Sequence, residues 1–342
     1  MDTVYFPYRS GTHLVLLHVI AHSGAWVKHG LNVEYEKYIS SSRSHDAVLK
    51  GEVEFIGGNH VSTYGHRARG DQWVYLGQTV NKVNHRLVVR QDAGIDSVAD
   101  LRFKKVITRG SHPGLNDWLF LKQRGLDADR SDVEIVNQIR HRKGSMDPAV
   151  LADPEGWTLP PLWQVVKEGE ADAAFLTPPG SLFAEQAGLK VIDVEPLPMI
   201  WFTTVSSSLK FVTQHPEIVE RFLKGMIEGI HFFKTRPEES IRIIQQYHTV
   251  EGKLTHEQAA ATWRNLAPQL EPSLVPGLQA IANVYEEAVR QDKDALRVNP
   301  MELWDLHYVR HLADSGFVDA LYGKERQAHA RQGSHKGGDG AG

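Results

Sequence analysis

Short apolar segments alternate with helical patterns through roughly the first 205 residues of the chain. Ten segments have the length, apolar content and flanking turn residues of strands: residues 4–7, 32–38, 55–58, 73–78, 86–89, 105–108, 133–137, 173–175, 191–194 and 201–205. Five stretches between them have helical periodicity: residues 14–29, 44–50, 114–124, 162–168 and 181–187. This alternation predicts parallel sheets covered by helices on both faces.

The pattern after Pro216 is helical throughout. Five further helices are predicted: residues 217–235, 237–247, 256–267, 275–290 and 301–308. The last segment, residues 323–342, is rich in Gly, Lys, Arg and His, and we expect it to be a disordered tail.

One helix–turn–strand unit occurs twice in the sequence. Residues 47–55 contain a helix end, Gly51, an acidic turn and a buried strand, and residues 165–175 repeat this order around Gly169. A glycine just past the last helical residue is a helix stop. The duplication predicts two similar α/β lobes that hold a ligand at the carboxyl ends of their strands.

Composition excludes several classes of function. The formal net charge is −4, so no overall positive field favours nucleic acid. The absence of cysteine excludes disulfides, cysteine nucleophiles and thiolate metal sites. The apolar run 14–21 is interrupted by His18 and is too short for membrane insertion.

The amino-terminal residues do not form an export signal. Met1 to Thr3 lead directly into the first predicted strand, with no basic segment before an apolar one. The sequence therefore predicts a cytoplasmic protein. A trimmed or wrongly assigned start is the alternative.

Four stretches resemble the nitrate-, sulfonate- and taurine-binding proteins: residues 25–34 (AWVKHGLNVE), 50–55 (KGEVEF), 97–106 (SVADLRFKKV) and 215–222 (HPEIVERF). They occur in the order found in that family, across about residues 4–320. The resemblance implies the type 2 periplasmic-binding-protein fold, an α/β fold of two lobes. Each lobe would be a mainly parallel sheet flanked by helices, with the ligand cleft between the lobes. This branch also contains thiamine-pyrimidine synthases and an aromatic sulfinate desulfinase.

The same resemblance implies the domain organisation. Lobe one would comprise residues 1–82 and 205–322, and lobe two residues 83–204. Hinges near residues 80–84 and 205–208 would let the lobes close on a ligand.

Two loops of lobe one carry candidate substrate-binding residues. Arg9 and Ser10 precede the first helix, where backbone N–H groups favour an anion. Ser41, Ser42 and Arg43 form a hydroxyl-rich loop before the second helix, which suits an oxyanion better than an apolar ligand. Plain helix capping explains one of these serines.

Further substrate-binding candidates follow other strands. Asn59 comes after two glycines that permit close approach of a ligand. Arg109 and Ser111 belong to a glycine-serine loop before a helix, which favours anions. Thr177 ends a strand of lobe two, and Trp201 is a candidate aromatic wall.

Histidines in three of these loops are candidate catalytic residues. His13, His60 and His112 are predicted to converge, and histidine transfers protons near neutral pH. With 18 histidines in the chain, chance placement in loops is the competing explanation. His18 and His22 share a helical face, but no third ligand is evident, so neither a metal nor another cofactor is predicted.

Two functions follow from these residues. The first is a cofactor-independent lyase, a decarboxylase or desulfinase-like enzyme of aromatic-compound catabolism that acts on a small aromatic acid by histidine general acid/base catalysis. The alternative is an ABC-transporter solute-binding protein for a sulfonate, nitrate or aromatic carboxylate. Both imply a small anionic, aromatic ligand. The oligomeric state stays open, with a homodimer among the alternatives.

The resemblance limits the enzyme hypothesis. The desulfinase-like members use a cleft cysteine and the pyrimidine synthases a cysteine-rich motif, and this chain contains neither. His60 would have to carry the corresponding chemistry.

Overall fold

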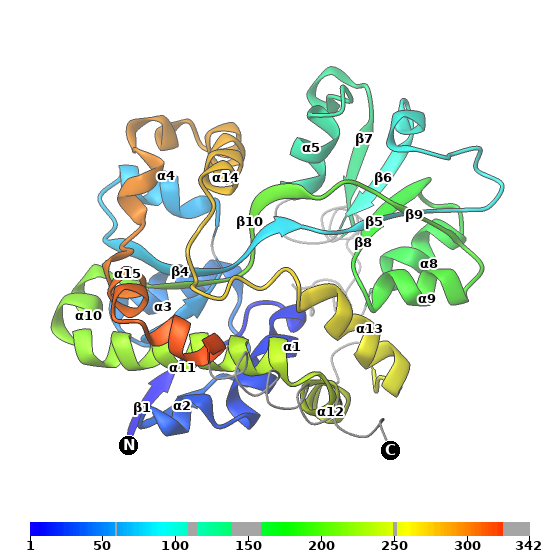
Figure 1. Cartoon of the computed structure of the whole chain (residues 1–342). Helices are drawn as coiled ribbons and strands as arrows, with labels where there is room; N and C mark the ends of the chain where they lie inside the picture. Colours follow the sequence, from blue (N-terminus) through cyan, green and yellow to red (C-terminus); the bar gives the residue numbers. More distant parts are fainter. Residues whose placement is uncertain (59, 109–114, 139–158, 249–251, 324–342) are drawn as a thin grey trace, which may run out of the picture.

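The computed structural model describes the chain except for residues 59, 109–114, 139–158, 249–251 and 324–342. Two lobes lie side by side and are joined by two long strands, β4 (Trp73–Val83) and β10 (Leu197–Ser208) (Figure 1). The predicted tail lies outside the described residues except for Gly323.

Lobe one contains two small sheets. In the first, β1 (Asp2–Tyr5) and β2 (Leu31–Glu34) pair in parallel, with Val4 opposite Val33. In the second, β10 lies between β3 (Ile56–Gly57) and β4 and is antiparallel to both.

Lobe two contains a five-stranded sheet in the order β7-β6-β8-β5-β9. Its strands are β5 (Arg86–Val89), β6 (Lys105–Thr108), β7 (Glu134–Asn137), β8 (Ala173–Leu176) and β9 (Lys190–Asp193). β6 is parallel to β7 and β8, whereas β5 is antiparallel to β8 and β9.

The prediction of parallel pairing therefore holds for β1–β2 and for β6 with its neighbours, and the sheets are otherwise mixed. The antiparallel pairs involve β10, which is itself one of the two connections between the lobes, and β5, which follows the other connection, β4. Residues 205–208, one of the two predicted hinges, lie inside β10, where they are buried and pair with β3 and β4. Hydrophobic alternation identifies strands but not their direction, which explains why the antiparallel pairing was not predicted.

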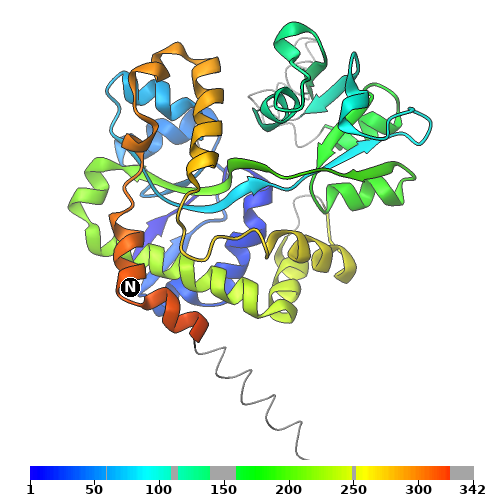
Figure 2. The ribbon, with the colours of Figure 1, turned by 45° about the horizontal axis from the view of Figure 1, so that its top comes forward.

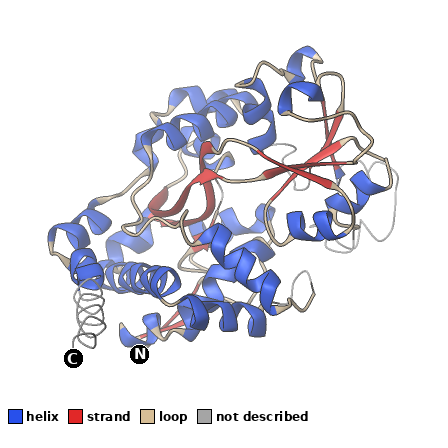
Figure 3. Ribbon diagram, turned by 45° about the vertical axis from the view of Figure 1, so that its right-hand side comes forward, coloured by secondary structure: helices blue, strands red, loops and turns tan. Residues whose placement is uncertain are grey.

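Helices cover the sheets (Figure 3). The α-helices are α1 (Gly11–His22), α2 (Ala25–Lys28), α3 (Ser41–Lys50), α4 (Ser62–Ala68), α5 (Leu115–Lys122), α8 (Leu162–Lys167), α9 (Gly180–Gln186), α10 (Leu209–Gln214), α11 (Pro216–Thr235), α12 (Pro237–Tyr247), α13 (His256–Leu266), α14 (Leu278–Gln291) and α15 (His307–Asp314). Four short 3₁₀ helices are η1 (Val98–Leu101), η2 (Ala128–Arg130), η3 (Lys293–Arg297) and η4 (Pro300–Leu303). None of the helices in the described residues has the length and apolar character needed to cross a membrane.

Two predicted helices are divided. The predicted helix 14–29 is split at Gly24, which adopts a left-handed conformation with φ of 76° and so ends the regular helix between α1 and α2. The predicted helix 301–308 becomes η4 and the start of α15. α4 and α10 were not predicted, because their short sequences lack an extended apolar stripe.

Helix α14 of lobe one faces lobe two (Figures 1 and 2), and two of its side chains form ion pairs with lobe two. Arg290 on α14 bonds both carboxylate oxygens of Asp129 in lobe two, at 3.0 and 2.7 Å, and its guanidinium lies over the Trp118 ring. Lys122 and Glu286 form a second ion pair between the lobes, at 2.8 Å. These contacts add to the two covalent connections.

Helix α11 holds lobe one together by packing against α1 and α2. Phe222 on α11 stacks on Trp26 at a centroid distance of 5.7 Å. Gly225, one turn later, leaves room for the same indole, since a Cβ at this position would lie 2.3 Å from Trp26 Cδ1. The close contact of α11 with α2 therefore depends on a residue without a side chain.

We expect Gly225→Ala to lower the free energy of unfolding by about 1–3 kcal/mol, because the added methyl group overpacks this contact. Gly180→Ala is the matched control: it lies at the start of α9, and its nearest neighbours would be 4.0 Å from the new Cβ. Urea unfolding of both variants measures the difference. Equal stability of the two variants would contradict the packing argument.

Candidate functional site

Two segments of lobe one that are far apart in the sequence meet at Arg9. The loop after β1 supplies Arg9 and leads into α1, whose first turn supplies His13. The end of β3 supplies Gly57 and Gly58, and His60 follows. The positive charge of Arg9 acts on the rings of both histidines.

Two glycines let these side chains approach the backbone. A Cβ at Gly58 would lie 2.7 Å from Arg9 Nη1, and the φ of Gly58 is 105°, a left-handed conformation that favours glycine. A Cβ at Gly57 would lie 3.4 Å from His13 Nδ1 and 3.3 Å from Thr203 Cγ2. The glycine pair noted in the sequence thus accommodates protein side chains, and Arg9 lies directly against it.

Both histidines of this site are neutral at pH 7. Burial, together with the positive charge of Arg9, lowers the pKa of His13 to about 3. Burial, Arg9 and His13 lower the pKa of His60 to about 3, although a hydrogen bond with the backbone of Phe202 acts in the opposite direction. His13 Nδ1 and His60 Nε2 are inaccessible to solvent and have no hydrogen-bond partner among the residues that the structure describes.

Strand β10 forms one wall of the site. The ring of Phe202 lies edge-on to His13 at a centroid distance of 5.4 Å. Phe202 has a φ of 64°, which is rare for a bulky residue, and it lies at an irregularity in the pairing of β10 with β4. Trp201, the predicted wall, is half-buried and packs against two hydrophobic clusters. The neighbouring Phe202 is the residue that lies next to His13.

The remaining predicted residues lie in different surroundings. Ser10 precedes α1 but makes no capping bond, and its hydroxyl pairs with that of Thr12 at 2.9 Å. Arg43 is exposed and pairs with Glu52 at 3.5 Å on the surface. Thr177 is half-buried, and its carbonyl accepts a hydrogen bond from the backbone N–H of Ser181.

Several predicted residues cannot be placed at the site. Ser41 and Ser42 begin α3, and their side chains lie outside what the structure describes. Asn59, Arg109, Ser111 and the candidate catalytic His112 also lie outside the described residues. The convergence predicted for three histidines is thus observed for His13 and His60.

Sequence reasoning missed a buried acid–base pair in lobe two. His85 lies in the short connection between β4 and β5, and Asp117 lies in the first turn of α5. The distance between His85 Nδ1 and Asp117 Oδ1 is 3.8 Å. Burial raises the pKa of Asp117 to about 7, although a hydrogen bond with Thr108 has the opposite effect. Burial and the charge of Arg124 lower the pKa of His85 to about 3. The only feature of the sequence that could have identified Asp117 is its position, three residues after the predicted loop 108–114.

A second group that was missed contains His45, His66 and Asp71 of lobe one. His18 and His22, considered as a metal pair from their spacing, have aromatic partners instead. His18 Nδ1 lies 3.0 Å from the hydroxyl of Tyr35, and His22 stacks on Tyr247 at 3.6 Å.

Comparison with known proteins agrees with this architecture. The family model for NMT1/THI5-like proteins matches residues 16–150. No curated protein sequence matches significantly. The alkanesulfonate-binding protein SsuA from Xanthomonas axonopodis pv. citri, bound to MOPS, superposes with a TM-score of 0.62 at 14% identity, covering 89% of this chain and 98% of that chain.

Two further solved structures extend the comparison. The periplasmic aliphatic sulphonate binding protein SsuA from Escherichia coli has a TM-score of 0.60 at 15% identity, with 86% of this chain and 88% of that chain covered. A variant of the desulfurization enzyme DszB in complex with biphenyl-2-sulfinic acid has a TM-score of 0.58 at 15% identity, with 92% and 99% covered.

These similarities establish the fold: the chain has the two-lobed α/β fold of the periplasmic binding proteins. The resemblance to the sulfonate- and nitrate-binding branch, including the desulfinase, is confirmed. Most of these neighbours bind solutes for transporters, and some are enzymes.

Proposed function

We propose that this chain is a solute-binding protein of an ABC-type uptake system and that its ligand is a small organic anion, a sulfonate or an aromatic carboxylate. The observation that carries the proposal is the meeting of Arg9 and His13, at the start of α1, with His60, which follows β3. We therefore prefer the transport function to the lyase function that the sequence favoured.

The chemistry of the three side chains suits an oxyanion. Arg9 supplies a permanent positive charge with planar N–H donors. The two imidazoles carry nitrogens that are buried and have no partner in the described part of the chain. Both nitrogens are closed to solvent in this conformation. If the surrounding segments moved apart, a sulfonate or carboxylate oxygen would supply such a partner.

The neighbours in fold support the same ligand class. Two of the structures compared above are described as sulfonate-binding proteins, and one of them holds MOPS, which is itself a sulfonate. Fold similarity alone does not identify a ligand. The proposal therefore depends on Arg9 and its two histidines.

A lyase acting on an aromatic acid is the second candidate function. Protonation of a ring carbon requires a group that carries a proton near neutral pH, and the low pKa of His13 and His60 makes them poor acids there. Asp117 is the observation that keeps this function open, because its pKa of about 7 suits proton transfer. The predicted cytoplasmic location would fit this function.

Replacing Arg9 tests the main proposal. We expect Arg9→Gln to weaken binding of a sulfonate or benzoate by about 10- to 100-fold, the loss associated with a charge-assisted hydrogen bond. Isothermal titration with MOPS, benzenesulfonate and benzoate measures the affinity. Arg310→Gln, which removes an exposed arginine paired with Asp314, is the control and should bind as the wild type does. Wild-type protein that binds none of the three at about 1 mM would contradict the proposal.

The affinity should also depend on pH. The free protein holds His13 and His60 neutral, with a pKa of about 3, and a bound anion raises the pKa of both rings by favouring their charged forms. Binding therefore takes up protons between pH 3 and the raised value, so the association constant rises as pH falls through that value.

Titrations with benzenesulfonate, which stays ionised, at several pH values from about 8 to 5.5 measure this dependence. His60→Gln should flatten the profile. An affinity that is constant or falls toward acidic pH would contradict the assignment of the two histidines.

Turnover tests the second function. If the chain is a lyase, wild-type protein should consume biphenyl-2-sulfinic acid or a hydroxybenzoic acid, and Asp117→Asn should reduce the rate by about 10²-fold or more, the contribution of one general acid. Product analysis by liquid chromatography measures the rate. Quantitative recovery of every intact acid after incubation with wild-type protein would exclude this function for the panel.

A further inference from the structure

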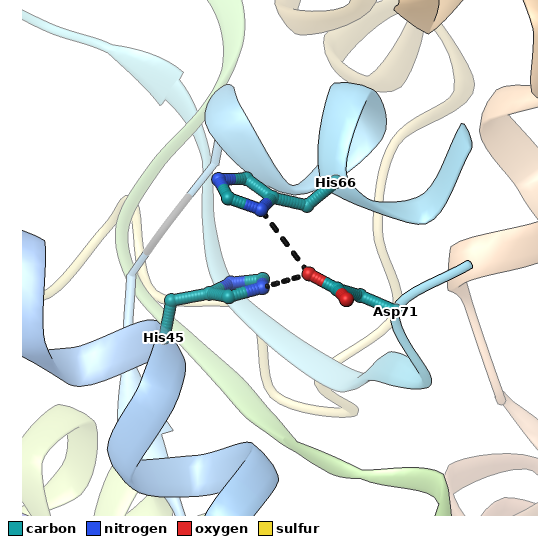
Figure 4. Close-up of side chains that lie close together, drawn as sticks. All are labelled: His45, His66 and Asp71. Atoms are coloured by element: carbon teal, nitrogen blue, oxygen red, sulfur yellow. Dashed lines mark hydrogen bonds and ion pairs between the residues drawn. The ribbon is translucent and has the colours of Figure 1, made fainter. Parts of the chain in front are cut away.

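Two imidazoles and one carboxylate meet on the outer helices of lobe one (Figure 4). His45 lies on the second turn of α3, His66 on the second turn of α4, and Asp71 just before β4. His45 Nε2 and His66 Nδ1 lie 2.7 and 3.1 Å from the same oxygen, Asp71 Oδ2. Each residue points one ligand atom inward, and the three atoms lie within 4.8 Å of one another.

The surrounding structure holds these three groups in place. The ring of His45 is buried and stacks on Trp73 at a centroid distance of 4.9 Å with an interplanar angle of 7°. The backbone N–H of Asp71 donates to the carbonyl of His66 at 3.2 Å, which closes the loop between them. Arg67 bonds the carbonyl of Asp71 and the side chain of Gln72, so its charge does not engage the Asp71 carboxylate.

We propose that His45, His66 and Asp71 bind one divalent zinc-type ion, with water in the fourth position. Two imidazole nitrogens and one carboxylate oxygen form a donor set that zinc accepts, and three protein ligands leave one position open. None of these three residues belongs to the candidate anion site, so this proposal does not depend on the proposed function.

The distances from the two imidazole nitrogens to the carboxylate oxygen are already close to those between ligands of one metal ion. Zinc binds imidazole nitrogen and carboxylate oxygen at about 2.0–2.2 Å, which places tetrahedral ligands roughly 3.3 Å apart. The present separations of 2.7 and 3.1 Å are shorter by a few tenths of an ångström. An ion inserted between the three atoms would replace the two N–H···O bonds. Each ring nitrogen would then offer its lone pair to the metal, with the proton carried by the other nitrogen of the same neutral ring.

Access from solvent is available on one side. The side chains of His66 and Asp71 are 40% and 34% exposed, whereas that of His45 is 7% exposed. An ion can therefore enter from the His66 side and retain a water molecule there.

Such an ion would connect α3 to α4. Loop residues before α4 include Gly57, Gly58 and His60 of the anion site, and Ser40 caps α3 through a bond from the Arg43 N–H. The metal would thus fix the relative position of two helices that begin beside candidate ligand loops. Its first measurable effect is on the stability of lobe one.

Zinc binding to tag-free, chelator-treated protein tests the proposal. We expect one zinc ion per chain by isothermal titration and a rise in Tm of at least about 3 °C with excess ZnCl₂ but not with MgCl₂. His66→Gln and Asp71→Asn should each weaken zinc binding at least tenfold. Cobalt(II) bound to wild-type protein should show the visible absorption of a four-coordinate site.

His307→Gln is the matched control, because His307 and Asp305 form an exposed histidine–carboxylate pair that has no third metal-ligating group beside it in the described part of the chain. This variant should bind zinc as the wild type does. Circular dichroism establishes that each variant is folded. Absence of stoichiometric binding at about 100 μM zinc, or binding unchanged in both His66→Gln and Asp71→Asn, would overturn the proposal.

Discussion

The antiparallel pairing of β4 with β10 is the interaction on which the two-lobed structure depends. It runs from Leu197 opposite Val83 to Ser208 opposite Trp73, so both chain crossings between the lobes are hydrogen-bonded to each other. Buried polar side chains reinforce it: Gln78 bonds the carbonyl of Trp201 at 2.7 Å, and Thr79 bonds that of Thr203 at 2.6 Å. A polar network of this kind is stable inside a core only when its members are paired. The orientation of lobe two therefore depends on a small sheet that belongs to lobe one.

The candidate anion site shows a competition between burial and charge. Arg9 keeps its charge at the half-buried end of the β1 loop, while burial removes the charge from His13 and His60 beside it. In the free protein the site thus contains one fixed cation and two neutral rings. Removing a second and third charge from water would cost several kcal/mol per ion, so neutral imidazoles are the less costly state until an anion arrives.

Much of the fold could be predicted from the sequence, because it depends on local patterns. The strand at residues 73–78, the helix at residues 217–235 and the repeated turns at Gly51 and Gly169 all have periodic or turn signals that the structure reproduces. Strand direction could not be predicted. β5 and β10 have the same apolar pattern as parallel strands, and their antiparallel direction is set by pairing with strands distant in the sequence.

The site was predictable only in part. Arg9 and His13 follow β1, and His60 follows β3. Since the ends of the strands can be recognised in the sequence, the meeting of these three residues could be predicted. The state of their charges depends on burial by residues distant in sequence, including Phe202, and periodicity does not report it. The same holds for Asp117, whose raised pKa arises from its surroundings, and for Asp71, which two imidazoles reach from different helices.

Phe202 belongs to the strand that connects the lobes and also to the wall of the anion site. Its left-handed backbone conformation costs on the order of 1–3 kcal/mol, which the surrounding packing must compensate. Its ring lies against His13, and its backbone bonds His60. A twist of β10 that relaxes this residue would displace both imidazoles together. A rotation of lobe two about β10 would therefore also change the positions of the candidate anion-binding residues.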